Sequence, residues 1–255
     1  MSRAPKQPVE RRLWGGFPTA ATLALMLASA TGSAQPIVYV NAAAAPGGNG
    51  QTWATAFQDL QDALAIAPPI EVWVAAGTYK PDRGSGNRNL SFRIGVDPPP
   101  TAVYGGFSGV ESARGERDPA AHIVVLSGDL LGNDASGFAN RGDNSGTVVI
   151  LFGNGFLDGV TIRGGNDSSG NGGALSLNAG VVRGCAFTDN QSGGHGGAIG
   201  GGSGAAGVID QCRFIGNLAT GQGIGGAIYT ASGTAQLTVT NSVFQANQAQ
   251  GFGGG

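Results

Sequence analysis

Apolar and polar positions in the second half of the chain follow one repeated pattern. The phrases FTDN, FIGN and FQAN, at 187–190, 214–217 and 244–247, recur every 27 to 30 residues, and a glycine pair follows each of them. Self-similarity at a fixed period of about 20 to 50 residues is the sequence signature of a solenoid. We therefore aligned the repeats on their first residue.

The alignment gives four columns of equivalent positions. They are the large apolar column Ile162, Phe187, Phe214 and Phe244; the amide column Asn190, Asn217 and Asn247; the small column Val160, Cys185, Cys212 and Ser242; and the second apolar column Leu157, Val182, Ile209 and Val239. Columns two residues apart share the period of a strand. Very short strands joined by glycine-rich turns, without helix-length amphipathic runs, predict an all-β parallel β-helix in which each repeat is one coil.

Stacked coils would turn each column into a ladder, because neighbouring strands lie about 4.8 Å apart. The phenylalanine column is expected to fill the core. Each asparagine is expected to bond the asparagine above and below it. The glycine pairs are expected to supply positive φ at the next corner.

The residues before the repeats predict a cap. Trp53, Phe57, Leu60 and Leu64 form one apolar face at helical spacing. A helix there would cover the open edge of the first coil, and such edges need cover. The expected organisation is a helical cap over 53–66, a first core strand over 70–77, loops around a short strand over 81–101, and a polar bulge over 127–147.

The repeat phrases GGAI and FxxN resemble the repeat pair of chlamydial polymorphic outer-membrane proteins and of secreted bacterial pectin-lyase-like proteins. The stretches 39–64, 72–81, 102–111 and 124–134 are similar to the opening coils of the second group. The resemblance covers roughly 37–255. It implies a single-stranded, right-handed parallel β-helix and export. It does not imply one activity, because that fold carries both surface proteins and polysaccharide-cleaving enzymes.

The N-terminus predicts export independently. Arg3, Lys6, Arg11 and Arg12 precede the apolar run TLALMLASA, and small residues follow it. This is the pattern of a signal peptide over 1–34 with cleavage after Ala34, the alternative being a retained anchor. The mature chain would comprise a cap region over 35–68 and the β-helix over 69–255. It ends at GFGGG, within an unfinished coil, so we expect a fragment of a longer product.

One column carries candidate chemistry. Asp158, Arg183 and Asp210 are equivalent positions on successive coils. Two carboxylates roughly 9–10 Å apart lie near the upper limit of about 6.5–9.5 Å for inverting glycosidases, and lyases of the resembled fold use a basic residue. The alternative is an exposed charge ladder in which Arg183 bridges both acids for about 0–1 kcal/mol. An arginine there keeps both acids ionised, which disfavours a general acid.

Two further sets stay open. Asp129, Asp134 and Asp143 lie in an Asx-rich stretch that could bind calcium, or could cap backbone groups in turns. Cys185 and Cys212 are stacked neighbours, which could form a disulfide or remain buried thiols. Calcium is the one cofactor that these residues suggest.

Charge limits the partners. The formal net charge of −2 gives no long-range attraction for nucleic acid, and no later segment reads as a membrane helix. We expect an exported, monomeric cell-surface or extracellular β-helix, acting as a non-catalytic scaffold or adhesin-like module. Alternatives are a polysaccharide lyase or glycoside hydrolase, or carbohydrate binding without cleavage. Partners would be polysaccharides or host or cell-surface ligands.

Overall fold

Short strands make up most of the regular secondary structure among the described residues. The computed structural model describes residues 35–251 except 69, 97–99, 154, 232 and 234. The predicted signal peptide over 1–34 lies outside the described residues, and so does the glycine pair that starts at Gly253.

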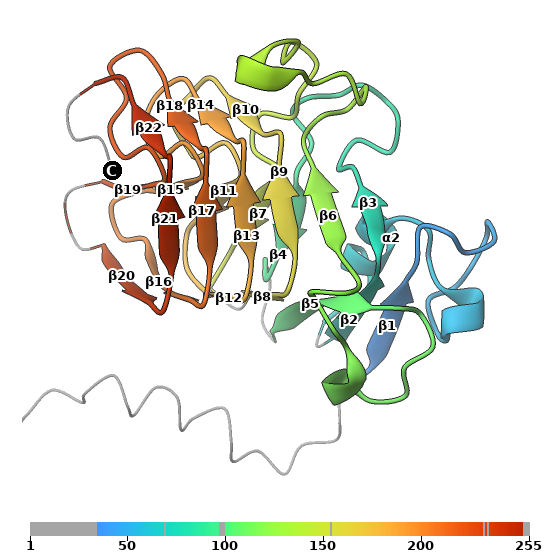
Figure 1. Cartoon of the computed structure of the whole chain (residues 1–255). Helices are drawn as coiled ribbons and strands as arrows, with labels where there is room; N and C mark the ends of the chain where they lie inside the picture. Colours follow the sequence, from blue (N-terminus) through green and yellow to red (C-terminus); the bar gives the residue numbers. More distant parts are fainter. Residues whose placement is uncertain are drawn as a thin grey trace, which may run out of the picture. The chain divides into compact units, whose positions relative to one another are not determined.

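The described strands form four sheets, and neighbouring strands in each sheet are parallel (Figure 1). The seven-stranded sheet contains, in order, β1 (Ile37–Val40), β2 (Ile70–Ala75), β5 (Thr101–Phe107), β8 (Gly155–Asp158), β12 (Val181–Arg183), β16 (Ala206–Asp210) and β20 (Gln236–Thr240). The six-stranded sheet contains β3 (Gly77–Tyr79), β6 (Val124–Ser127), β9 (Thr161–Arg163), β13 (Ala186–Thr188), β17 (Arg213–Ile215) and β21 (Val243–Gln245).

The other two sheets are smaller. The five-stranded sheet contains β4 (Phe92–Ile94), β7 (Val149–Leu151), β11 (Leu175–Leu177), β15 (Ile199–Gly201) and β19 (Ile228–Thr230). The four-stranded sheet contains β10 (Asn166–Asp167), β14 (Gln191–Ser192), β18 (Leu218–Ala219) and β22 (Gln248–Ala249). The described helical segments are η1 (Trp53–Thr55), α2 (Leu60–Leu64), η2 (Arg114–Glu116) and η3 (Ser136–Phe138). The predicted all-β class with parallel strands is confirmed.

From β8 onward the chain visits the sheets in a fixed order. It passes through the seven-, six-, four- and five-stranded sheets and then returns to the first. We call one such passage a circuit. Phe187 pairs in register with Ile162 on one side and with Phe214 on the other. Equivalent residues of successive circuits therefore lie directly beside each other, as the repeat alignment predicts.

The inward columns form the main core. Leu157, Val182 and Ile209 are fully buried on the seven-stranded sheet. The ring of Phe187 stacks on that of Phe214 with centroids 4.7 Å apart. Phe244 stacks on Phe214 at 4.8 Å but keeps 46% of its surface exposed. This departs from the predicted filled core, because β21 is the edge strand of its sheet among the described residues.

Glycine is required at the corner that precedes the five-stranded sheet. Gly172, Gly196 and Gly225 have φ angles of 91°, 67° and 72°. A Cβ atom on Gly196 would also overlap the carbonyl oxygen of Ile199. Both the left-handed backbone and the close approach exclude larger side chains there.

The predicted single cap helix over 53–66 is wrong. Two short pieces replace it, because Ala56 between them has a ψ of 148° and Phe57 bridges to Val40. Thr52 caps η1 and Asp59 caps α2, so each piece begins with its own polar cap. The first core strand is β1 rather than 70–77, since β1 pairs with β2 along its whole length.

A second apolar cluster lies on the other face of the seven-stranded sheet. Its buried members are Trp73, Ala102, Tyr104 and Phe107. Trp73 stacks on Phe107 with centroids 4.7 Å apart. The segment after β5 contacts this cluster through Glu111, whose carbonyl oxygen accepts from the indole N–H of Trp53. That segment carries the arginines of the site described next.

Candidate functional site

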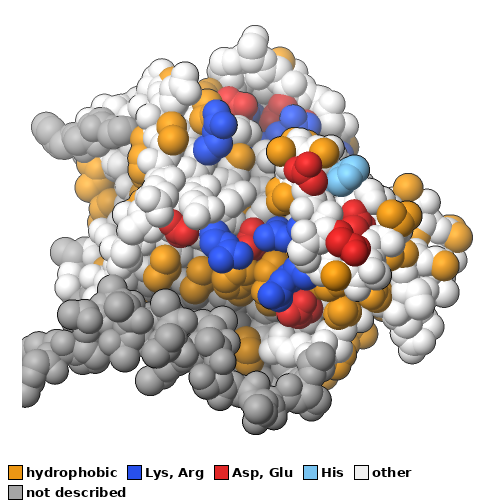
Figure 2. Space-filling view, turned by 60° about the horizontal axis from the view of Figure 1, so that its bottom comes forward, with side chains coloured by type: hydrophobic (Ala, Val, Ile, Leu, Met, Phe, Trp, Pro, Cys, Tyr) orange, Lys and Arg blue, Asp and Glu red, His pale blue; other side chains and the backbone are white. Residues whose placement is uncertain are grey.

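The predicted column of charged residues lies on the outer face of the seven-stranded sheet. Asp158 on β8 pairs in register with Arg183 on β12, which pairs with Asp210 on β16. Tyr104 precedes them on β5. Figure 2 looks onto this face and shows cationic and acidic side chains lying side by side among apolar ones. The structure therefore brings the three predicted residues onto neighbouring strands.

Asp158 is buried and bound on both carboxylate oxygens. Arg183 donates to Oδ2 from Nε at 3.0 Å and from Nη2 at 2.7 Å. Arg117 lies 2.9 Å from Oδ1 through its Nη2 atom. Only 3% of Asp158 is exposed. The exposed ladder that the sequence suggested is thus wrong for Asp158, because Arg117 reaches over it from the segment after η2.

Asp210 belongs to a different local network. Thr240 and Asn241 each donate to its Oδ1 atom at 2.8 Å. These two bonds hold the pKa of Asp210 below its usual value, and the bond from Asn241 has the largest effect. Among the described residues Arg183 forms an ion pair with Asp158 and none with Asp210. The predicted bridge across both acids is therefore wrong.

The arginines also contact the outer aromatic cluster. The guanidinium carbons of Arg114 and Arg117 lie 4.6 and 5.4 Å from the centre of the Tyr104 ring. Arg114 also donates to Glu71. Neither arginine belongs to a repeat, so their role could not be predicted from the periodicity. The face is an internally bonded network in which both carboxylate oxygens of Asp158 already pair with arginines.

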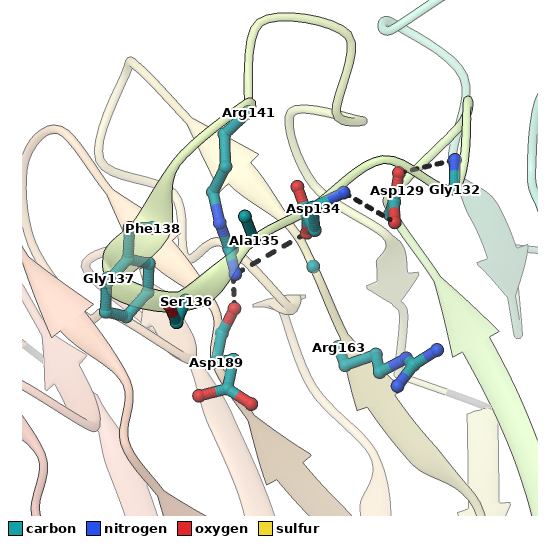
Figure 3. A pocket seen from close by; sticks show the side chains of 11 residues that line it. Asp129, Gly132, Asp134, Ala135, Ser136, Gly137, Phe138, Arg141, Arg163 and Asp189 are labelled. Atoms are coloured by element: carbon teal, nitrogen blue, oxygen red, sulfur yellow. Dashed lines mark hydrogen bonds and ion pairs between the residues drawn. The ribbon is translucent and has the colours of Figure 1, made fainter.

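A separate cavity of about 540 Å³ lies under the loop between β6 and β7 (Figure 3). Its lining consists of one aromatic ring, small residues and charges of both signs: Asp129, Gly132, Asp134, Ala135, Ser136, Gly137, Phe138, Arg141, Arg163, Gly164 and Asp189. The predicted bulge over 127–147 has only η3 as regular structure. Hydrogen bonds rather than strands hold the loop over the cavity.

Two of the three candidate calcium ligands accept from the backbone of this loop, and the third, Asp134, accepts from the side chain of Asn144. Asp129 accepts from the N–H groups of Gly132, Asn133 and Asp134. Asp143 accepts from the N–H of Leu131 at 2.9 Å. In the part of the chain that the structure describes, no three acidic, histidine or cysteine side chains converge as a metal site would require.

Arg141 crosses the cavity wall between Phe138 and Asp134 (Figure 3). It donates from Nη1 to the carbonyl oxygen of Asp189 at 2.6 Å, and its Nη2 lies 3.5 Å from Asp134 Oδ2. Its guanidinium carbon lies 4.6 Å from the centre of the Phe138 ring. Burial lowers the pKa of Arg141 and raises the pKa of Asp134. Sequence reasoning missed Arg141, Arg163 and Phe138, because none of them stands in a recognisable motif.

The asparagine column occupies the interior of a corner. Asn190 accepts at Oδ1 from the N–H of Gly165 and donates from Nδ2 to the carbonyl oxygen of Ile162. Asn217 makes the corresponding bonds to Asn190 and Phe187. Asn247 does so for Asn217 and Phe214. These residues satisfy backbone groups of neighbouring circuits, and we assign them a structural role.

The two cysteines are buried free thiols. Cys185 donates to the carbonyl oxygen of Arg183, and Cys212 donates to that of Asp210. Ser242, the next residue of the column, makes the same contact with Thr240. Burial is the largest of the causes that raise the pKa of Cys185. Three of the four members of the column thus donate to the carbonyl oxygen two residues earlier, and Val160 fills the equivalent position without a donor.

Comparisons with protein-family models, curated proteins and solved structures give no match to this chain. None of the helices in the described residues is long and apolar enough to cross a membrane.

Proposed function

We propose that the protein is an exported scaffold of the cell surface or extracellular space, without catalytic activity. Its architecture in this proposal is a single-stranded, right-handed parallel β-helix whose coils are the circuits described above. Such a solenoid presents a long, regular surface, and each circuit contacts only its neighbours.

The observation that carries the proposal is the burial of Asp158 together with its bonds to two arginines. It is the most buried member of the predicted acidic column, and both of its oxygens are bound to arginines. A general acid or base must be able to reach the reacting atom within hydrogen-bond distance. Asp158 cannot do so without breaking its ion pairs, and Asp210 is held by Thr240 and Asn241.

Export rests on the sequence of the first 34 residues. Expression of the full chain in a bacterial host, followed by fractionation and N-terminal sequencing, tests it. We expect a processed product outside the cytoplasm that begins at Gln35. An unprocessed chain that stays in the cytoplasm would overturn this part of the proposal.

Absence of catalysis is tested by a depolymerisation screen. The purified chain is incubated with acidic and neutral polysaccharides, with and without calcium, and unsaturated products and new reducing ends are followed. We expect no turnover from a sample that circular dichroism shows to be folded. Turnover on any substrate would overturn the scaffold proposal, and its loss in Arg183→Ala would make the charged column the catalytic site.

A further inference from the structure

The cavity under the loop between β6 and β7 contains groups that the fold does not use. Among the described residues, the guanidinium of Arg163 and the carboxylate of Asp189 form no ion pair or hydrogen bond, although both line the cavity and are exposed. They stand on the neighbouring strands β9 and β13 or at the corner just beyond, since Arg163 pairs in register with Thr188. One free donor and one free acceptor therefore border the same space.

The wall behind them is also incompletely bonded. Arg141 is only 8% exposed, yet its Nε atom has no partner among the described residues. The Oδ1 atom of Asp134 is likewise buried without a partner. Native proteins leave few buried polar atoms unpaired, and each such atom calls for an explanation. Here two of them occur side by side in one cavity wall.

The backbone of the loop is strained where it closes the cavity. Phe138 and Asn140 both have a φ of 62°, in the left-handed region. A bulky residue such as phenylalanine rarely adopts this conformation. Its packing against Arg141 holds the ring on the cavity wall. Backbone strain of this kind concentrates at ligand-binding sites.

The charges of the lining limit the ligand. Three aspartates and two arginines face the cavity, so its formal charge is −1. An anionic ligand would meet Asp129, Asp134 and Asp189, and a cationic one would meet the two arginines. Hydroxyl groups avoid both repulsions, because each can donate to a carboxylate and accept from a guanidinium. The volume lies within the range of about 300–1,000 Å³ that is usual for small-molecule sites.

We propose that this cavity binds a neutral saccharide unit, with Asp189 accepting from and Arg163 donating to its hydroxyl groups and Phe138 contacting its apolar face. Arg141 and Asp134 position the loop that carries Phe138. The proposal depends neither on export nor on the absence of catalysis, so the experiments above can fail without affecting it.

Three probes of the same size and different charge test the ligand class. The full chain is titrated with glucose, glucuronate and glucosamine, and with the corresponding galactose series, and binding is followed by NMR chemical shifts. We expect saturable binding of a neutral sugar, with weaker binding of both charged relatives. No binding in either series, or tighter binding of a charged member, would overturn the proposal.

Two exposed substitutions locate the site. Asp189→Asn keeps the left-handed backbone accessible, because asparagine tolerates that conformation. We expect Asp189→Asn and Arg163→Gln each to raise the Kd about tenfold or more, through loss of a hydrogen bond to a charged group. Arg213→Gln is the matched control, since Arg213 is an exposed arginine of the same sheet outside the cavity, and it should leave the Kd unchanged. Unchanged affinity in both cavity variants would place the sugar elsewhere and reject the proposal.

Discussion

Asn190 donates a hydrogen bond of 3.0 Å from its side-chain amide to the side-chain oxygen of Asn217. Asn217 repeats the contact with Asn247 at 2.8 Å. The same side chains bond backbone N–H groups and carbonyl oxygens of neighbouring circuits. Because Asn190 also bonds Gly165 and Ile162, the asparagine ladder joins four circuits and satisfies backbone groups that are mostly buried.

Replacement of Asn217 by alanine should remove these bonds and leave buried groups of Phe187 and Asn190 unpaired. We expect the free energy of unfolding to fall by about 2–4 kcal/mol, measured by chemical denaturation. Asn178→Ala is the control, because Asn178 is exposed, and it should change stability by less than about 0.5 kcal/mol. Equal losses in the two variants would show that the ladder does not stabilise the fold.

The stacked phenylalanines allow a comparison within one column. Phe187 is fully buried and Phe244 is 46% exposed. Phe187→Ala should lower the free energy of unfolding by about 3–5 kcal/mol, and Phe244→Ala by less than about 2 kcal/mol. Denaturation of both variants under the same conditions checks the order. A larger loss for Phe244 would contradict the assigned burial.

Arg117 and Arg183, which both pair with Asp158, should contribute differently to the free energy of unfolding. The side chain of Arg117 is 15% exposed and that of Arg183 is 47% exposed. Arg117→Ala should cost about 2–4 kcal/mol, because both charges of this pair are largely buried and water cannot replace the lost partner. Arg183→Ala should cost about 1 kcal/mol.

A double-mutant cycle separates the ion pair of Arg117 from its packing. In an Asp158→Asn background, Arg117→Ala should cost clearly less than in the parent chain, because the buried charge is gone. An unchanged cost would assign the effect to the contacts of Arg117 with Tyr104 and the carbonyl oxygen of Gly105 instead.

The carboxyl group of Glu111 should make the free energy of unfolding depend on pH. Burial raises the pKa of its carboxyl group, but bonds from the backbone N–H groups of Ser108 and Val110 outweigh this and lower the pKa from 4.5 to about 2. A pKa lowered by folding contributes stability above the unfolded value, and that stability is lost as the pH falls from 4.5 towards 2. Unfolding measured across this window should show a smaller acid loss in Glu111→Gln than in the parent chain. Parallel pH profiles would contradict the assignment.

Periodicity predicts what repeats and nothing else. The register of Phe187 beside Phe214 follows from the sequence because each circuit places equal residues at equal positions. Arg117 and Phe138 lie outside the circuits, in segments whose course depends on tertiary contacts. The division of the expected cap helix has a related cause, since the cap of Asp59 and the bridge of Phe57 to Val40 override the apolar spacing.

The circuits differ in length without losing register. Asp158 and Arg183 are 25 residues apart, Asn190 and Asn217 are 27 apart, and Asn217 and Asn247 are 30 apart. The turns absorb the extra residues while the ladders stay aligned. Gain or loss of residues in a turn is thus compatible with the fold, and so is duplication of an entire circuit. Unequal crossing-over can therefore add whole circuits to such a protein, and each added circuit extends the existing core.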